Sequence, residues 1–180
     1  MKMRSHFLNL HMSVKVKRHE KEALFFVTFT CYKWLPLFEK TSLYDNIYKW
    51  FTYMELQGIK TAGYVLLPNH IHCMIYLPTD SKDLDIVIGN CKRFLTYEII
   101  KRLKEQKDVE TLELLEKYVT YRENKNGKIH NVFQPSFDAQ LCLSEKFTLI
   151  KLKYMHLNPL SGKWKLAEGF LEYEHSSARY

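Results

Sequence analysis

The sequence contains no run of about 20 apolar residues, which is the length that a membrane-spanning helix needs. Residues 1–21 carry several cations but neither a long apolar stretch nor a small-residue cleavage pattern, so a secretory signal peptide is not expected. No internal repeat and no low-complexity tract is present. These absences favour an ordinary globular protein of the cytoplasm without a membrane anchor.

Cysteine is scarce, and none of the four cysteines belongs to a C-x-x-C pair. Because structural zinc sites usually depend on such paired ligands, a zinc site of this kind is not expected. Cys31 and Cys73 lie in apolar runs. We therefore interpret the cysteines as reduced core thiols of a cytoplasmic protein.

Acidic residues are outnumbered, with 20 Asp and Glu against 27 Lys and Arg and a net charge of +7. This excess favours a polyanionic partner such as nucleic acid, although a demand for solubility alone would give the same sign. The chain has 180 residues, of which 46% are hydrophobic, and this is enough for one core without cross-links. We predict a single domain over residues 1–180, in which residues 1–20 form a loose basic arm.

The hydrophobic pattern predicts three strands and three helices. Apolar and β-branched runs bounded by turn residues are typical of strands, and apolar residues at intervals of three and four are typical of helices. The predicted strands are residues 23–32, 59–67 and 70–77, and the predicted helices are residues 42–57, 84–107 and 144–157. Ser42 and Ser144 are the expected N-caps of the first and last helix.

Two further segments are less regular. Residues 108–131 are the most polar part of the chain, and a short strand is expected beside the turn signal Asn126-Gly127. Residues 133–143 are expected to be irregular or extended. The short break at Pro68-Asn69 predicts antiparallel pairing of the second and third strands. The order of elements predicts an α+β sandwich with helices packed on an antiparallel sheet.

His70 and His72 flank Ile71 in the third predicted strand. Residues i and i+2 of a strand point to the same side, so the two imidazoles would project together while Ile71 anchors the strand in the core. Imidazole is a common ligand of divalent transition metals. With eight histidines in the chain, a chance pair is the alternative interpretation. The pair is a candidate metal site that needs a third ligand from elsewhere.

Tyr154 and Asn158 are four residues apart in the last predicted helix and share a face. The same face carries Phe147 and Ile150, which we expect to dock the helix on the sheet. A tyrosine on an amphipathic helix is more commonly structural, and Asn158 before a proline is also typical of a helix end.

A catalytic interpretation of this helix is also open. A tyrosine hydroxyl, with a pKa near ~10, is a weak nucleophile at neutral pH. A divalent cation and the flanking Lys151 and Lys153 would make Tyr154 more reactive, and the amide oxygen of Asn158 would complete a His-His-Asn ligand set on the metal.

Together these segments resemble the REP-associated tyrosine transposases, which are single-tyrosine members of the HUH endonuclease superfamily. PNHIH after an apolar strand, followed by YMHLNP in the last helix, is a specific combination in this order. Further segments resemble other elements of the family in the same order, so the resemblance covers residues 23–180; they are FFVTFTCYKWLPLF, NCKRFLTYEI, VFQPSFDAQL and LEYEHSSARY. The N-terminal arm has no counterpart, and residues 108–131 are expected to be a variable loop.

The resemblance implies a ferredoxin-like fold whose C-terminal helix carries the tyrosine, with Mg²⁺ or Mn²⁺ as the cofactor. It implies His70, His72 and Asn158 as metal ligands and Tyr154 as the nucleophile. The implied activity is DNA transposition, in which single-stranded or hairpin DNA is nicked and rejoined by transesterification through a 5′-phosphotyrosine intermediate. Whether Tyr154 acts in its own subunit or in the partner of a homodimer is left open.

Six cations are candidate DNA-backbone contacts, with ordinary solvated surface charges as the alternative. They are Lys92, Arg93, Lys101, Arg102, Lys151 and Lys153. Two other functions also remain open, namely a domesticated nucleic-acid-binding module that does not cut and a metal-dependent nuclease that uses water.

Overall fold

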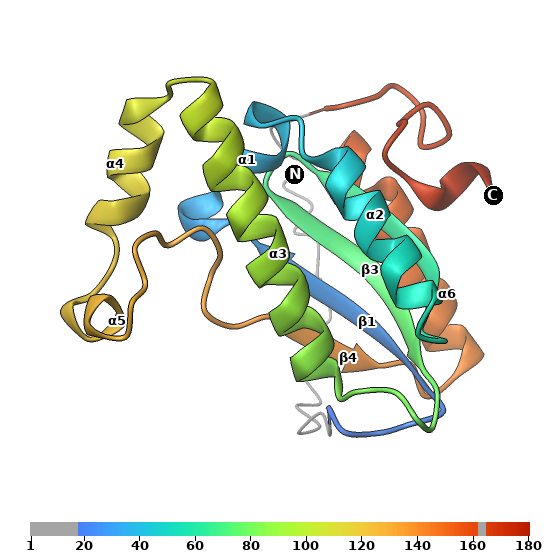
Figure 1. Ribbon diagram of the computed structural model, residues 1–180. Coiled ribbons are helices and arrows are strands. Elements are labelled where there is room, and N and C mark those ends of the chain that lie inside the picture. Colours follow the sequence, from blue (N-terminus) through green and yellow to red (C-terminus); the bar gives the residue numbers. More distant parts are fainter. Residues whose placement is uncertain (1–17, 162–164) are drawn as a thin grey trace, which may run out of the picture.

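Four strands form one antiparallel sheet in the order β2-β3-β1-β4 (Figure 1). The computed structural model describes residues 18–161 and 165–180. The strands are β1 (Ala23–Thr30), β2 (Lys60–Leu67), β3 (His70–Leu77) and β4 (Asp138–Leu141). One helical connection separates β1 from β2 and another separates β3 from β4, which together with the strand order is the ferredoxin-like arrangement. The predicted α+β fold with a central antiparallel sheet is thereby confirmed.

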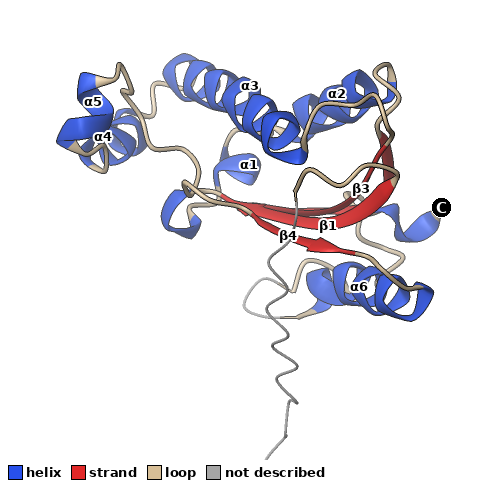
Figure 2. Cartoon of the chain, turned by 90° about the horizontal axis from the view of Figure 1, so that it is seen from below, coloured by secondary structure: helices blue, strands red, loops and turns tan. Residues whose placement is uncertain are grey.

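Helices cover both faces of this sheet, with α2 and α3 on one face and α6 on the other (Figure 2). The helices are α1 (Leu37–Lys40), α2 (Tyr44–Glu55), α3 (Leu84–Glu105), α4 (Val109–Lys117), α5 (Tyr121–Lys125) and α6 (Glu145–Leu157), and short 3-10 turns are η1 (Tyr32–Trp34), η2 (Asn158–Leu160) and η3 (Ser177–Arg179). Among the described residues, no helix is both long and apolar enough to cross a membrane.

The alternation of side chains along the strands decides what lies on each face of the sheet. Ile71 of β3 contributes to the main core between the sheet and the helices α2 and α3. Met74 of β3 contributes to a second, smaller core below α6, together with Phe26 of β1. His70 and His72 have the same parity as Met74 along β3, so they lie on the α6 face.

Helix α6 docks on the sheet through Leu152 and Met155, which pack against Gly63 of β2. A Cβ atom on Gly63 would lie 3.0 Å from Cε of Met155 and 3.1 Å from Cδ1 of Leu152, so a larger residue would crowd both side chains. The expectation that Phe147 and Ile150 dock this helix is wrong for Ile150, which is 54% exposed. Phe147 is half-buried. The docked face of α6 is therefore not the face that carries Ile150.

Elements with a strong hydrophobic period lie close to where the sequence places them. The predicted strand 70–77 is β3, and the predicted helix 84–107 is α3. The inward residues expected for α3 are fully buried; they are Ile88, Cys91, Leu95, Ile99 and Leu103. Ser144 is the N-cap of α6, and its hydroxyl accepts a hydrogen bond from the backbone N–H of Phe147.

Two local predictions are wrong. Ser42 does not cap α2, because its φ of 49° places it in the left-handed region and Leu43 holds the N-cap position. Residues 108–131 contain the helices α4 and α5 rather than a strand beside the Asn126-Gly127 turn. Helix α5 begins with a capping box of Thr120 and Glu123, a signal that the sequence pattern T-x-x-E offers.

The remaining predictions concern the cysteines and the N-terminal arm. All four cysteines are free thiols, and three of them are fully buried, whereas Cys142 is half-buried. Residues 1–17 of the predicted arm lie outside the described residues. Arg18 and His19 contact Asp85 and Asp83 at the start of α3, which ties this part of the chain to the domain.

Candidate metal and nucleophile site

His70 and His72 stand at the beginning of β3, where both side chains are buried and only 8% and 5% exposed. Their ring centroids lie 4.8 Å apart and the ring planes are nearly perpendicular, at 87°. The two imidazoles project to the same side of the sheet, as i and i+2 residues of a strand must.

Hydrogen bonds hold one nitrogen of each imidazole. Nδ1 of His70 lies 2.6 Å from Oδ1 of Asn69, and Nδ1 of His72 lies 2.6 Å from Oγ1 of Thr28. Thr28 is the residue of β1 directly opposite His72 in the antiparallel register. Phe26 of β1 stacks on the His72 ring at a centroid distance of 5.5 Å. Both rings are therefore held by neighbouring groups, and their Nε2 atoms are not used in these contacts.

Burial also controls the charge of the two histidines. Loss of solvation lowers the pKa of His70 to about 4. Loss of solvation, together with the positive charges of protonated His70 and of Lys151, lowers the pKa of His72 to about 3. Both imidazoles are therefore neutral at pH 7, which is the form that binds metal ions.

The C-terminal end of α6 brings Tyr154 and Asn158 to the same place. The Tyr154 ring lies 5.4 Å from the His72 ring and 6.1 Å from the Phe26 ring, measured between centroids. Nδ2 of Asn158 lies 3.1 Å from Nε2 of His72. Tyr154 is nevertheless 52% exposed, so about half of this residue is accessible to solvent. The four residues singled out in the sequence thus meet within one chain.

The arrangement of donors fits a divalent cation. Mg²⁺ or Mn²⁺ with ligands at about 2.1 Å in octahedral geometry has adjacent ligands about 3 Å apart. The separation of 3.1 Å between His72 Nε2 and the Asn158 amide agrees with this spacing. Rotation of the amide by half a turn presents Oδ1, the atom that can bind a metal. The described residues hold no cluster of three His, Cys, Asp or Glu side chains suited to a metal, and Asn158 is the candidate third donor beside the two histidines.

One lysine of α6 lies beside the candidate nucleophile. Nζ of Lys151 is 5.2 Å from the ring centre of Phe26 and 6.0 Å from that of Tyr154. Lys153 is exposed on the same helix. A positive charge is therefore available beside the Tyr154 ring.

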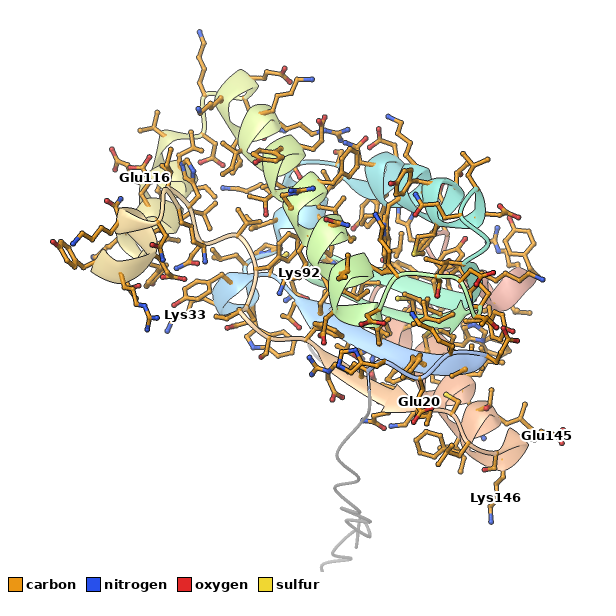
Figure 3. The ribbon with its side chains drawn as sticks, turned by 60° about the horizontal axis from the view of Figure 1, so that its bottom comes forward. Glu20, Lys33, Lys92, Glu116, Glu145 and Lys146 are labelled. Carbon is orange, nitrogen blue, oxygen red and sulfur yellow. The ribbon has the colours of Figure 1, made fainter. Side chains whose placement is uncertain are left out.

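The other candidate DNA contacts lie on α3, across the sheet from Tyr154 (Figure 2). Lys92 is half-buried, and its ammonium donates to the carbonyls of Gln134, Pro135 and Ser136 at 2.5, 3.2 and 3.3 Å. Figure 3 shows Lys92 beside α3, well away from Glu145 and Lys146 in the first turn of α6. Lys92 thus ties the segment before β4 to α3.

Of the other three candidate DNA contacts on α3, one is held within the protein by two ion pairs. Arg102 forms ion pairs with Asp45 of α2 and Glu98 of α3. Arg93 and Lys101 are exposed. The structure brings none of these side chains to the histidine pair, so any DNA contact they make is separate from the candidate site.

A groove of about 1040 Å³ runs between α3 and residues 127–137. Its lining includes six cations, which are Arg18, Lys92, Arg93, Lys101, Lys104 and Lys128. Arg18 pairs with Asp85, Lys128 with Glu123 and Lys101 with Glu105. Because carboxylates and carbonyls already engage most of these cations, the groove offers less positive charge to a polyanion than its lining suggests.

Sequence reasoning missed Thr28, Asn69 and Phe26 as parts of the site. Asn69 was within reach, since it directly precedes His70 in PNHIH. Thr28 and Phe26 lie far from the histidines in the sequence and meet His72 through the register of β1 on β3. No local signal marks that register.

Comparison with known proteins adds to this geometry. No family model matches the sequence, and no curated protein matches it. A solved REP-associated tyrosine transposase bound to a REP hairpin aligns with a TM-score of 0.60 and 16% sequence identity, over 89% of this chain and 79% of that chain. The chain has the fold of a REP-associated tyrosine transposase. This shared fold supports the family resemblance that PNHIH and YMHLNP indicate.

A second solved structure, a "putative transposase" from Deinococcus radiodurans R1, aligns with a TM-score of 0.38 and 10% identity. The alignment covers 86% of this chain and 95% of that chain. This likeness is too low to support an argument, and the transposase fold is established by the first match.

Proposed function

We propose that the protein is a metal-dependent endonuclease and transposase that cuts and rejoins single-stranded DNA through a 5′-phosphotyrosine intermediate. The observation that carries the proposal is the meeting of His70 and His72 of β3 with Tyr154 and Asn158 at the end of α6. These elements are far apart in the sequence, and each has a commoner structural interpretation when taken alone.

The surroundings of the four residues favour chemistry over packing. Two buried, neutral histidines cost solvation free energy that an apolar pair would not cost. A tyrosine that serves only the core is buried, as Tyr173 is at 9% exposure, whereas Tyr154 is 52% exposed beside the buried His72. A half-exposed tyrosine next to two buried imidazoles that could bind a metal is an arrangement suited to attack on a bound phosphate.

His70, His72 and Asn158 would hold the cation, which supplies positive charge to offset the negative charge that develops on the scissile phosphate. Two imidazole donors favour Mn²⁺ over Mg²⁺, because Mg²⁺ prefers oxygen ligands and its own water shell. We therefore expect Mn²⁺ to support the reaction at lower concentration than Mg²⁺.

In the proposed reaction, the Tyr154 hydroxyl attacks the phosphorus of a DNA phosphodiester. A bond forms between Oη and phosphorus, the bond from phosphorus to the 3′ oxygen breaks, and the phenol proton passes to solvent while the 3′ oxygen gains one. The products are a 5′-phosphotyrosine link and a free 3′-OH. Because one phosphodiester replaces another, a second 3′-OH can reverse the step and join new ends without ATP.

A hairpin or single strand of DNA is the proposed partner. The solved transposase of the same fold is bound to a REP hairpin, and the net charge of +7 favours a polyanion. Lys151 lies beside the Tyr154 ring and Lys153 is exposed on the same helix, and both are proposed to contact the cut strand. DNA that also reached Arg93 and Lys101 of α3 would have to pass around the edge of the sheet.

The test is to incubate the protein with labelled hairpin DNA that carries single-stranded flanks, in the presence of Mn²⁺. We expect a covalent protein–DNA adduct that survives boiling in detergent. Tyr154→Phe should abolish the adduct while DNA binding, measured by fluorescence anisotropy, stays within about two-fold. Tyr97→Phe, at an exposed tyrosine of α3, is the matched control and should form the adduct as the unmodified protein does.

Other outcomes would contradict the proposal in distinct ways. An adduct of equal yield with Tyr154→Phe would show that another residue is the nucleophile. Cleavage of DNA without any adduct would favour a nuclease that uses water. Tight binding of DNA without cleavage or adduct would favour a domesticated binding module.

A further inference from the structure

Asn69 is buried, with 1% of its surface exposed, and its amide contacts two groups at once. Nδ2 donates to the carbonyl of Trp34 at 2.9 Å, and Oδ1 lies 2.6 Å from Nδ1 of His70. A carbonyl can only accept a hydrogen bond, so Nδ2 must face Trp34 and Oδ1 must face the imidazole. Because an amide oxygen also only accepts, Nδ1 of His70 must carry the proton.

This arrangement decides which nitrogen of His70 can bind a metal. A neutral imidazole carries one proton, so Nε2 of His70 keeps its lone pair. Metal-binding histidines commonly donate their other N–H to a carbonyl, carboxylate or water, which sets the tautomer and orients the ring. Asn69 makes this contact to His70.

The backbone of Asn69 is itself held in place. The main-chain carbonyl of Asn69 accepts a hydrogen bond from the backbone N–H of Cys31 at 2.8 Å. The main-chain carbonyl of Pro68 accepts one from the backbone N–H of Phe38 at 3.0 Å. The turn between β2 and β3 is thereby tied to the end of β1 and to α1. The position of the His70 ring is consequently set by the backbone of three segments and not by the ring's own packing alone.

His72 is held differently. Its Nδ1 faces the Thr28 hydroxyl, which can donate or accept, and its Nε2 faces the Asn158 amide, which can present either atom. Neither neighbour by itself decides the tautomer of His72. Thr28 orients the ring, and the lone pair of Nε2 is selected when a cation binds there.

We infer that Asn69 is a positioning residue that locks His70 in the Nδ1–H tautomer with Nε2 directed to the candidate metal position, and that Thr28 orients His72 without locking it. The inference rests on the proposed metal site for its purpose. It concerns a residue for which neither the sequence resemblance nor the shared fold assigns a role.

The experiment begins with the metal-free protein, treated with a chelator and labelled with ¹⁵N-histidine. NMR of the imidazole nitrogens at pH 7 should show His70 as a single Nδ1–H tautomer in the unmodified protein. Asn69→Ala should give a mixture of tautomers, whereas Asn69→Asp loses the donation to the Trp34 carbonyl but should keep the Nδ1–H form, because a carboxylate also accepts from Nδ1. Asn46→Ala, at a buried asparagine of α2, is the matched control and should leave His70 unchanged.

Mn²⁺ titration by calorimetry is the second measurement. Asn69→Ala should weaken Mn²⁺ binding by about 10- to 100-fold, the usual effect of removing a partner of a metal ligand, and Asn69→Asp should restore it. Thr28→Val should weaken binding and Thr28→Ser should not, since serine keeps the hydroxyl. Thermal unfolding of each variant shows whether it is folded. If Asn69→Ala does not fold, the tautomer of His70 in the unmodified protein still tests the inference.

The inference is overturned if His70 of the unmodified protein carries its proton on Nε2. It is also overturned if a folded Asn69→Ala keeps both the single tautomer and the full Mn²⁺ affinity. Failure of the unmodified protein to bind Mn²⁺ would remove the metal site and this role of Asn69 together. Intact Mn²⁺ binding without any DNA adduct would contradict the proposed transposase reaction and leave the role of Asn69 supported.

Discussion

At the scale of single residues, burial determines what the two histidines can do. His70 and His72 are nearly inaccessible to water, and this loss of solvation keeps both rings neutral far below their ordinary pKa of 6.5. The same burial that prepares them as metal donors makes the metal-free protein sensitive to acid.

The first prediction concerns this sensitivity. Below pH 6.5 the histidines of the unfolded chain take up protons, whereas in the folded protein His70 stays neutral to about pH 4 and His72 to about pH 3. The unfolded state therefore binds more protons in this range, and the free energy of unfolding falls as the pH drops from 6.5 toward 4. Above pH 6.5 both histidines are neutral in the folded and the unfolded protein, so they no longer make the free energy of unfolding depend on pH.

Chemical denaturation in the presence of a chelator, at several values between pH 7.5 and 4.5, measures this dependence. The double variant His70→Gln, His72→Gln should lose less stability over this interval than the unmodified protein, because glutamine does not titrate. Equal losses in the two proteins would show that the pair contributes no proton linkage. Other acidic and basic groups are common to both proteins and cancel in the comparison.

At the scale of elements, the position of α6 depends on a missing side chain. Gly63 lies next to an irregularity in the β2–β3 pairing, and its lack of a Cβ lets Leu152 and Met155 approach the strand. The docked face in turn directs Tyr154 and Asn158 toward His72. A small change in the height of α6 above the sheet would separate the candidate nucleophile from the metal donors.

The second prediction is that Gly63→Leu lowers the rate of DNA-adduct formation by roughly 10- to 100-fold, because a displacement of about 1 Å is enough for such a loss. Single-turnover measurements with saturating DNA would report this rate. Gly89→Ala in α3 is the control, since an added Cβ there meets nothing within 4 Å. An unchanged rate in a folded Gly63→Leu protein would show that the approach of α6 at this point does not position Tyr154.

At the scale of the whole molecule, the candidate site is assembled from one chain. Tyr154 lies on the α6 of the same subunit as His70 and His72, with its ring 5.4 Å from that of His72. A homodimer would not be needed to complete this site. The sheet separates it from the groove along α3, so the two faces of the molecule are chemically distinct.

The third prediction follows from this completeness. Tyr154→Phe and the double variant His70→Ala, His72→Ala should each be inactive, and a mixture of the two should remain inactive, because no subunit then holds both halves of a site. The assay is detergent-resistant adduct formation on the labelled hairpin. Recovery of about a quarter to a half of the activity on mixing would show that Tyr154 acts in the partner subunit.

Much of the fold could be predicted from local pattern, because apolar residues that are buried on one face of a strand or helix recur at a regular spacing along the sequence. The bounds of β3, the inward face of α3 and the common side of His70 and His72 all follow from periods of 2.0 and 3.6 residues. Residues 108–131 show where this approach weakens. There the turn signal Asn126-Gly127 points to a strand, whereas the residues rich in Leu and Glu of α4 and the capping box of α5 favour helices, and α4 packs against α3.

By itself, the sequence determined the α+β class, the candidate ligands and the candidate nucleophile, since these depend on residue type, spacing and order along the chain. Tertiary structure alone decided which face of α6 docks, because the gap at Gly63 admits Leu152 and Met155 and leaves Ile150 in solvent. It also decided that Thr28 meets His72 and that Asn69 holds His70. Such contacts depend on strand register and turn closure, which arise from the packing of the whole chain and leave no trace in any one segment.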